Sequence, residues 1–209
     1  MQPPVLEVTD GEYLLPPDKV AMVVTYLQTF TPPDRPEIAA PDGVALRPWD
    51  EVDAGSYLAL FRAIGTPWLW YGRLLKTPAE IDAILTENAF HIAERAGKPV
   101  GLLELARQPQ GDVEIAYFGF VPGETGRGLG AWLMDHAQRL AWSHPQTRRV
   151  WLHTCTGDDP AALRFYRKMG FQPYARGLEI VTDPRLCGLH APDAGPASLP
   201  FIPLPTIPA

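Results

Sequence analysis

The stretch from Val113 to Leu140 decides the fold: it combines an apolar strand, the glycine loop Gly126-Arg127-Gly128-Leu129-Gly130 and an amphipathic helix that starts at Ala131. Glycines at alternate positions let successive backbone N–H groups turn toward one point. The helix adds unpaired amides and the positive end of its dipole at the same place. The stretch therefore predicts an anion site held mainly by backbone, with Arg127 as an added cation; a structural turn that only allows close packing is the alternative.

The composition of the 209 residues is that of a globular protein, with 46% hydrophobic and 20% charged residues. The 24 prolines are concentrated near residues 1–48 and after Asp183, so the ends read as extended segments and the middle as regular structure. We expect an N-terminal accessory segment over 1–42 that contains one strand, a folded domain over 43–183 and a proline-rich tail over 184–209.

The formal charge of −6 argues against nucleic acid or an anionic membrane as a partner. No apolar run approaches the roughly 20 residues of a membrane span, and the first residues lack the features of a signal peptide. A cytoplasmic location is therefore the expectation. The two cysteines form neither a disulfide framework nor a metal-ligand spacing, and Cys155 is interpreted as a small core residue.

Apolar periodicity and turn residues predict an α+β fold, with a mixed but mostly antiparallel sheet flanked by helices. Strands are expected at 20–27, 44–47, 89–94, 99–106, 113–121 and 149–154, with a closing pair at 171–174 and 178–182 and a hairpin within 5–15. Helices are expected at 50–64, from 77, after the glycine loop and at 159–169. The strand at 149–154 should lie parallel to 113–121 through a right-handed crossover.

Three large aromatic residues, Trp68, Trp70 and Tyr71, lie close together between the first two expected helices. Such a group either lines a substrate pocket or packs into the core.

Two blocks in this order resemble the signature of the GNAT superfamily of acetyl-CoA-dependent N-acetyltransferases. The first is the glycine loop after its strand. The second, about 30 residues later, is Asp159-Pro160-Ala161-Ala162-Leu163-Arg164-Phe165-Tyr166-Arg167-Lys168-Met169-Gly170-Phe171. The resemblance covers roughly residues 44–182, and shorter strings at 114–120 and 153–156 resemble a bacterial subgroup.

The resemblance implies a sheet that opens between the parallel strands 113–121 and 149–154, with coenzyme A in the gap and its pyrophosphate on the amides of 126–131. The pantetheine arm would pair with backbone near 118–121. The cofactor-binding residues implied are Phe118, Gly119, Phe120, Val121, Gly126, Arg127, Gly128, Leu129, Gly130, Ala131, Asp159, Ala162 and Phe165. No metal is implied.

The implied reaction is direct transfer of an acetyl group from acetyl-CoA to a primary amine of a small molecule or peptide. The amine must lose a proton and the departing thiolate must gain one. Glu114 is the candidate base, with Glu104 and His153 as alternatives, and Tyr166 is the candidate proton donor. Thr125 stands where the family often has Gln or Arg, and Asp159 stands where it often has Asn. These two departures put in question one side-chain contact to the phosphate and one to the pantetheine arm.

Other interpretations are weaker. Gly126-x-Gly128-x-x-Ala131 also fits a dinucleotide-binding pattern, with Arg148 and Arg149 nearby, but too few strand–helix units follow it. A P-loop would need Lys-Ser or Lys-Thr after the glycines. A non-catalytic coenzyme A sensor or assembly module with the same fold is the main alternative. The tail either covers its own domain or reaches a partner such as a second copy of the chain.

Overall fold

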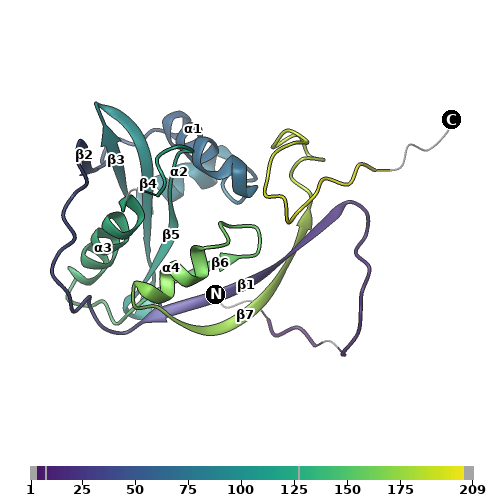
Figure 1. Cartoon of the computed structure of the whole chain (residues 1–209), viewed down its shortest axis with the longest axis horizontal. Helices are drawn as coiled ribbons and strands as arrows, with labels where there is room; N and C mark the ends of the chain where they lie inside the picture. Colours follow the sequence, from purple (N-terminus) through teal and green to yellow (C-terminus); the bar gives the residue numbers. More distant parts are fainter. Residues whose placement is uncertain (1–3, 8, 127, 205–209) are drawn as a thin grey trace.

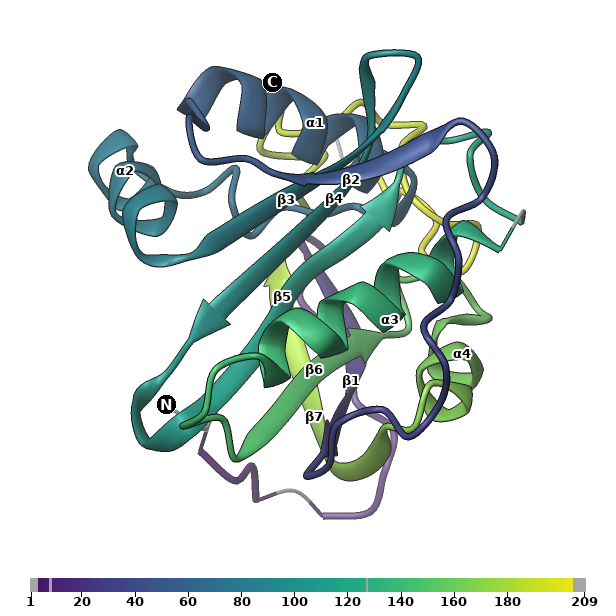
Figure 2. The ribbon, with the colours of Figure 1, turned by 90° about the vertical axis from the view of Figure 1, so that its left-hand side faces the viewer.

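A computed structural model describes residues 4–7, 9–126 and 128–204 of the chain (Figures 1 and 2). The strands are β1 (Lys19–Thr29), β2 (Val44–Pro48), β3 (Ala89–Arg95), β4 (Lys98–Arg107), β5 (Asp112–Phe120), β6 (Arg149–Cys155) and β7 (Gln172–Thr182). The helices are α1 (Ala54–Gly65), α2 (Pro78–Glu87), α3 (Leu129–Trp142) and α4 (Ala162–Lys168), with short 3-10 turns η1 (Thr66–Trp68) and η2 (Pro109–Gly111).

The strands form one sheet in the order β2-β3-β4-β5-β6-β1-β7. All neighbours are antiparallel except β5 and β6, which confirms the predicted α+β fold with a mostly antiparallel sheet. The parallel pairing runs only from Asp112 opposite Arg149 to Glu114 opposite Trp151. Beyond that point β5 and β6 continue without pairing to each other, so the sheet opens where a splayed pair was expected.

The N-terminal strand β1 lies inside this sheet. It pairs with β6 on one side and β7 on the other, although the sequence had assigned it to an accessory segment. The predicted closing pair at 171–174 and 178–182 is wrong: these residues form the single strand β7, whose partner is β1. The hairpin expected within residues 5–15 is also wrong, since no strand forms in the described part of that stretch.

Two apolar clusters cover the two faces of the sheet. One contains the buried side of α3, including the fully buried Trp132 and Leu133, and the other contains Tyr57 and Phe61 of α1. Figure 2 shows α3 crossing the strands on one face and α1 and α2 lying away from it. The sheet is therefore a middle layer. The gap where β5 and β6 stop pairing faces α4 and the loop after α1.

Local sequence signals set most helix ends. α2 begins with a capping box, in which Thr77 and Glu80 exchange hydrogen bonds, as its sequence predicted. α1 begins at Ala54 rather than at residue 50, because the Asp53 side chain accepts a hydrogen bond from the Ser56 amide. α4 begins at Ala162, because Asp159 accepts from the Ala161 amide within the turn that precedes the helix.

A β-bulge in β5 changes which side chains share a face. Glu104 pairs with Tyr117 and Leu105 pairs with Ile115, so Ala116 is an extra residue. Phe118 consequently packs against the cluster beneath α3, whereas Tyr117 packs against the α1 cluster. Simple alternation along the strand would place Glu114 and Phe118 on one face, but the bulge places them on opposite faces.

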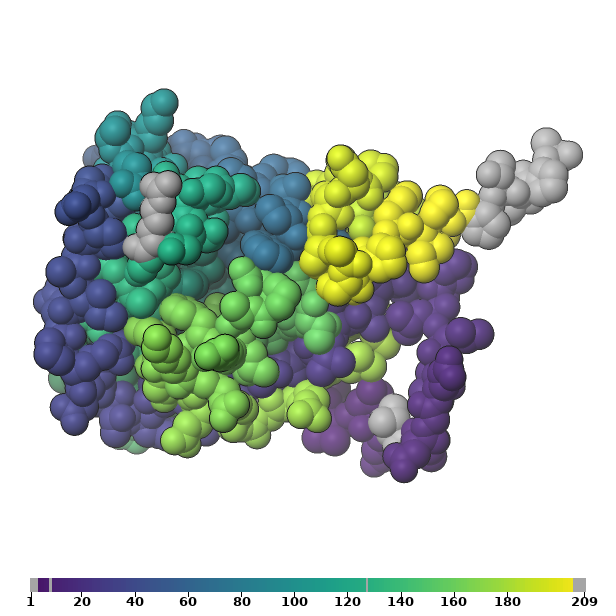
Figure 3. Space-filling view, viewed as in Figure 1, coloured from purple at the N-terminus to yellow at the C-terminus, as the bar shows by residue number. Residues whose placement is uncertain are grey.

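Residues 183–204, here called the C-terminal strap, fold back onto the domain (Figure 3). The strap is organised around the buried Arg185, which forms an ion pair with Asp183 at 2.7 Å and donates to the carbonyl groups of Ala194 and Leu199. Arg62 of α1 donates to the Leu189 carbonyl at 2.8 Å. The described part of the proline-rich tail thus covers its own domain.

Candidate active site

A large cavity of about 590 Å³ lies at the gap in the sheet between the ends of β5 and β6. Its walls come from the end of β5, the glycine loop, the start of α3 and the loop and helix that follow β6. They are Ile64, Trp68, Trp70, Phe118, Gly119, Phe120, Thr125, Gly126, Gly128, Gly130, Ala131, Asp158, Asp159, Ala161, Ala162, Phe165 and Tyr166. This volume falls within the range of about 300–1,000 Å³ that small-molecule sites usually occupy.

The glycine loop forms one end of this cavity. Gly126 and Gly128 have φ angles of +86° and +80°, and apart from their chain neighbours no heavy atom of the described residues lies within 4 Å of the position a Cβ would take at either glycine. Gly128 caps α3 in the left-handed conformation without a side-chain hydrogen bond to the helix. The first amides of a 14-residue helix therefore face open space, as an oxyanion site requires.

The structure brings together most of the residues predicted to bind the cofactor. Ten of the predicted residues line the large cavity: Phe118, Gly119, Phe120, Gly126, Gly128, Gly130, Ala131, Asp159, Ala162 and Phe165. Leu129 does not, because its side chain is fully buried beneath α3. Val121 is partly buried between the two apolar clusters, and Arg127 lies outside the described residues.

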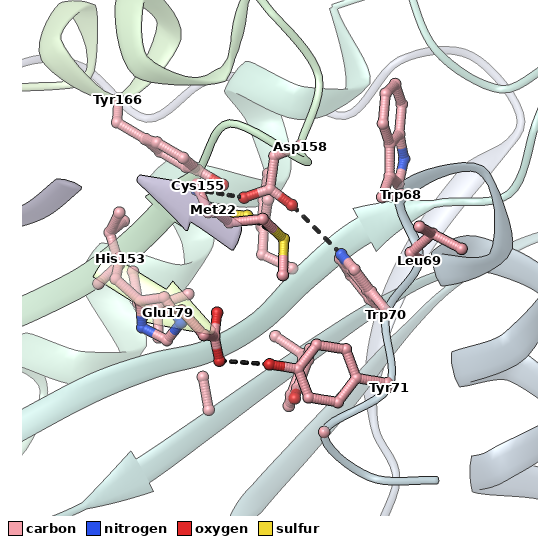
Figure 4. A pocket seen from close by; sticks show the side chains of 16 residues that line it. Met22, Trp68, Leu69, Trp70, Tyr71, His153, Cys155, Asp158, Tyr166 and Glu179 are labelled. Carbon is pink, nitrogen blue, oxygen red and sulfur yellow. Dashed lines mark hydrogen bonds between the residues drawn. The ribbon is translucent and has the colours of Figure 1, made fainter. Parts of the chain in front are cut away.

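A second, smaller cavity of about 140 Å³ adjoins the first (Figure 4). Both cavities are lined by Trp68, Trp70, Phe118, Asp158 and Tyr166, which mark their common boundary. Of the two alternatives left open for the aromatic group, the structure shows the pocket, since Trp68, Trp70 and Tyr71 all line the small cavity. The remaining lining residues are Met22, Leu69, Gly72, Ile115, Ala116, Tyr117, Leu152, His153, Cys155 and Glu179.

Two carboxylates face the small cavity. Asp158 accepts hydrogen bonds from the Thr154 hydroxyl at 2.8 Å and from the Cys155 amide at 2.9 Å, and its other oxygen lies 3.4 Å from Nε1 of Trp70. Glu179 of β7 accepts a hydrogen bond from the Tyr71 hydroxyl, a contact that Figure 4 marks with a dashed line. Both acids are thus fixed by neighbouring groups of the wall.

Tyr166 stands on the boundary between the cavities. Burial, with added repulsion from Asp158 and Asp159, raises the pKa of its phenol above the ordinary value. The hydroxyl therefore stays protonated throughout the physiological range. Burial likewise raises the pKa of the Cys155 thiol to about 12, which disfavours the reactive thiolate form.

The three residues considered as bases occupy different places. Glu104 is fully buried and bound by Arg73 at 2.5 Å and by Tyr57 and Asn88 at 2.6 Å each, and it lines neither cavity. Glu114 also lies behind the cavity walls, where burial raises the pKa of its carboxyl to about 7. His153 does line the small cavity, and its Nδ1 lies 3.8 Å from Oε1 of Glu114.

The comparisons with known proteins agree with this geometry. The sequence model of the Acetyltransferase (GNAT) family matches residues 52–171, more than half of the chain. The chain belongs to the GNAT family. A comparison with curated protein sequences found no match.

Solved structures show the same fold. A GCN5-related N-acetyltransferase from Kribbella flavida is 23% identical, with a TM-score of 0.52 over 80% of this chain and 63% of that one. A GCN5-related N-acetyltransferase from Sphaerobacter thermophilus is 21% identical, with a TM-score of 0.54 over 77% of this chain and 51% of that one. This GNAT chain therefore spans less than two thirds of the length of either protein.

Some site residues of this GNAT protein were missed from its sequence. Glu179 lies in a strand whose residues were interpreted only as part of the sheet, and Asp158 was passed over for the neighbouring Asp159. Met22 reaches the site only because β1 lies beside β6. A carboxylate among the apolar residues of the last strand, Leu178 to Val181, was the one available signal for Glu179.

Two further findings concern only the described residues of this GNAT chain. No group of three His, Cys, Asp or Glu side chains is placed so that it could hold a metal ion. None of the helices in this part of the chain has both the length and the hydropathy of a membrane span.

Proposed function

We propose that the protein transfers the acetyl group of acetyl-CoA directly to a primary amine of a small molecule. One observation carries the proposal: the large cavity, with its glycine loop, meets a small acid- and aromatic-lined cavity at Tyr166. A donor and an acceptor that occupied the two cavities would come together at that boundary. Such proximity is a large part of the catalysis of group transfer between two substrates.

The large cavity supplies the features that coenzyme A needs. The amides at the start of α3 and the open glycines would hold the pyrophosphate. The β5 backbone between Phe118 and Phe120 lies at the cavity wall, where the pantetheine arm would pair. Bound acetyl-CoA supplies the acetyl group as a thioester and departs as the thiol. Thr125 and Asp159 line the cavity where the family often has Gln or Arg and Asn, respectively. The Thr125 hydroxyl can still donate a hydrogen bond, whereas an ionised carboxylate at Asp159 can only accept one.

The phenol of Tyr166 donates a proton or a hydrogen bond to the departing sulfur. A coenzyme thiol has a pKa near that of cysteine, about 8.5, so its thiolate benefits from a donor at neutral pH. The raised pKa of Tyr166 keeps that donor protonated.

The amine loses its proton to His153, and Glu114 stabilises the imidazolium from behind. His153 is the one candidate base that lines the small cavity, and Glu114 lies 3.8 Å from its ring. In this proposal Glu114 acts through His153 as a positioning residue. The pKa of about 7 at Glu114 leaves it ionised above neutrality, where it favours the charged histidine.

A peptide amine remains a second acceptor class in this proposal, and a homodimer a second assembly state. We also place the reaction in the cytoplasm, with no nucleic-acid or membrane partner, as the acidic composition indicated.

The test is release of free thiol from acetyl-CoA by the purified chain with a panel of primary amines, each compared with its tertiary analogue. The proposal predicts saturable release with one or more primary amines and none with the tertiary ones. Stabilisation of the protein by acetyl-CoA without any amine-dependent thiol release would instead support the non-catalytic sensor or assembly module.

A further inference from the structure

We infer that the acceptor is a compact diamine without a carboxylate group, with one ammonium held by Glu179 while the other nitrogen is acetylated. The inference rests on the proposed acetyl transfer and names the substrate class of the same site.

The size of the small cavity limits the acceptor. Its volume of about 140 Å³ is well below the 300–1,000 Å³ of ordinary ligand sites, so the group it encloses has few non-hydrogen atoms. The strap packs against the outside of the segment that forms one wall of this space: His190 Nε2 lies 2.8 Å from the carbonyl oxygen of Trp70, and Leu69 packs closely on Gly195. Figure 3 shows the strap, in yellow, against the segment that carries these residues.

The charged side chains that line the small cavity favour a positively charged acceptor. Asp158 and Glu179 are the acids of the small cavity, and no lysine or arginine of the described chain lines it. A carboxylate on the acceptor would thus lie near two acids without a basic partner other than His153. Desolvating such a group without a counter-charge is costly, so an amino acid is disfavoured relative to the corresponding amine.

The aromatic walls strengthen this preference. Trp70, Tyr71 and Tyr166 line the cavity. The ring of Tyr117 is not counted among them, because it is packed against Trp70 and carries the guanidinium of Arg73, which is paired with Glu104. The faces of aromatic rings attract ammonium groups, and the attraction grows when water is excluded. An acid together with several ring faces is a typical environment for a bound alkylammonium.

The two acids have different tasks. Asp158 lies on the boundary with the large cavity, and three donors already use its oxygens. Glu179 lines only the small cavity, and Tyr71 is its one hydrogen-bond partner among the described residues. Glu179 therefore retains acceptor capacity for an ammonium at the end away from Tyr166, which leaves the other nitrogen at the boundary.

Only one of the two nitrogens of the diamine reacts. The free amine forms a bond to the acetyl carbonyl carbon as the bond to sulfur breaks. The proton that the nitrogen loses to His153 is matched by the proton that the thiolate gains. The ammonium on Glu179 is unchanged, and the product is a mono-acetylated diamine.

The experiment compares three acceptors of equal chain length: 1,4-diaminobutane, n-butylamine and ornithine. We expect kcat/KM for the diamine to exceed that for either other compound by about tenfold or more, as one charged hydrogen bond allows. In Glu179→Gln the diamine should lose about tenfold, mainly through KM, and n-butylamine less than about threefold. Glu94→Gln, a partly buried acid that is paired with Arg47 and lines neither cavity, is the matched control and should change none of the three.

Binding separates this inference from the proposed function. Calorimetric titration of the coenzyme A-loaded protein with the same compounds should rank the diamine first, and Glu179→Gln should abolish that ranking. If the diamine binds best but no thiol is released, acetyl transfer is wrong while the diamine site stands. If ornithine is equal or better, or if Glu179→Gln weakens all three equally, the diamine inference is wrong.

Discussion

The indole nitrogen of Trp70 lies 3.4 Å from Oδ1 of Asp158, and this contact joins two segments 88 residues apart in the chain. Trp70 comes from the loop after α1, and Asp158 comes from the turn after β6. Both residues line both cavities, so their contact spans the opening between the splayed strands. The site is therefore built across the point where β5 and β6 stop pairing.

Replacing Tyr166 by Phe should lower kcat by about 100-fold, a common cost of losing a general acid, and change coenzyme A affinity little. The phenyl ring keeps the packing against Phe118, and only the proton donor is lost. Tyr174→Phe is the control, because that tyrosine lines neither cavity. An unchanged kcat in Tyr166→Phe would show that Tyr166 is not the proton donor.

Replacing Gly128 by Ala should weaken coenzyme A binding at least about tenfold. A Cβ at φ +80° strains the loop by about 1–2 kcal/mol and enters the anion cradle. Gly123→Ala is a matched control, since Gly123 has φ +90° and equally open surroundings but does not line the large cavity. Calorimetry and thermal unfolding measure both variants, and an equal loss of affinity would show a general backbone effect instead of a cofactor site.

The free energy of unfolding should depend on pH because the pKa of the Glu114 carboxyl is raised. Its pKa is raised to about 7 from an ordinary value of 4.5, so its contribution to stability is full below pH 4.5 and is lost as pH rises through 7. Glu114→Gln should therefore gain on the order of 3 kcal/mol relative to the parent protein between pH 4 and pH 8, measured by urea unfolding.

Glu80→Gln provides a control of opposite sign. Lys76 and Thr77 lower the pKa of Glu80 to about 2 from an ordinary value of 4.5, so its contribution to stability is full above about pH 5 and is lost as pH falls from there toward 2. Its difference from the parent should stay flat between about pH 6 and pH 8 and should change in the opposite direction as pH is lowered to about 4. A difference for Glu114→Gln that is also flat between about pH 6 and pH 8 would contradict the raised pKa of its carboxyl.

Replacing Arg185 by Met should raise KM for the amine, by roughly tenfold if the wall shifts by about 1 Å, and leave coenzyme A affinity intact. The strap holds the Trp70 segment through His190, and Arg185 organises the strap. Loss of one partner of the buried pair with Asp183 also costs about 3–5 kcal/mol of stability. Arg47→Met, which breaks an exposed ion pair, is the control. An equal effect of the two variants on the KM for the amine would show that the strap does not hold the wall of the amine site.

Local patterns were enough for much of this structure. The strands expected at 89–94, 99–106 and 113–121 form β3, β4 and β5, the helix expected from 77 forms α2, and the glycine loop forms an open turn before α3. Each depends on residues close in sequence, whose backbone preferences act wherever the segment lies.

The remaining features depend on distant partners. β1 joins β6 and β7 through pairs such as Val24 with Cys155, more than 100 residues apart, and no local signal specifies that neighbour. The bulge at Ala116 reversed the expected faces of β5. Glu179 became part of the site only because β7 runs beside β1, and the strap acquired its role through Arg185 and His190.

The central claim is that the two joined cavities catalyse acetyl transfer from acetyl-CoA to a small amine. The most direct measurement counts the acetylated amine by mass spectrometry and the free thiol in the same reaction, with 1,4-diaminobutane as acceptor. We predict equal amounts of mono-acetylated diamine and thiol, both falling together in Tyr166→Phe. Thiol without acetylated amine, or no product from any primary amine while acetyl-CoA still binds, would contradict the claim.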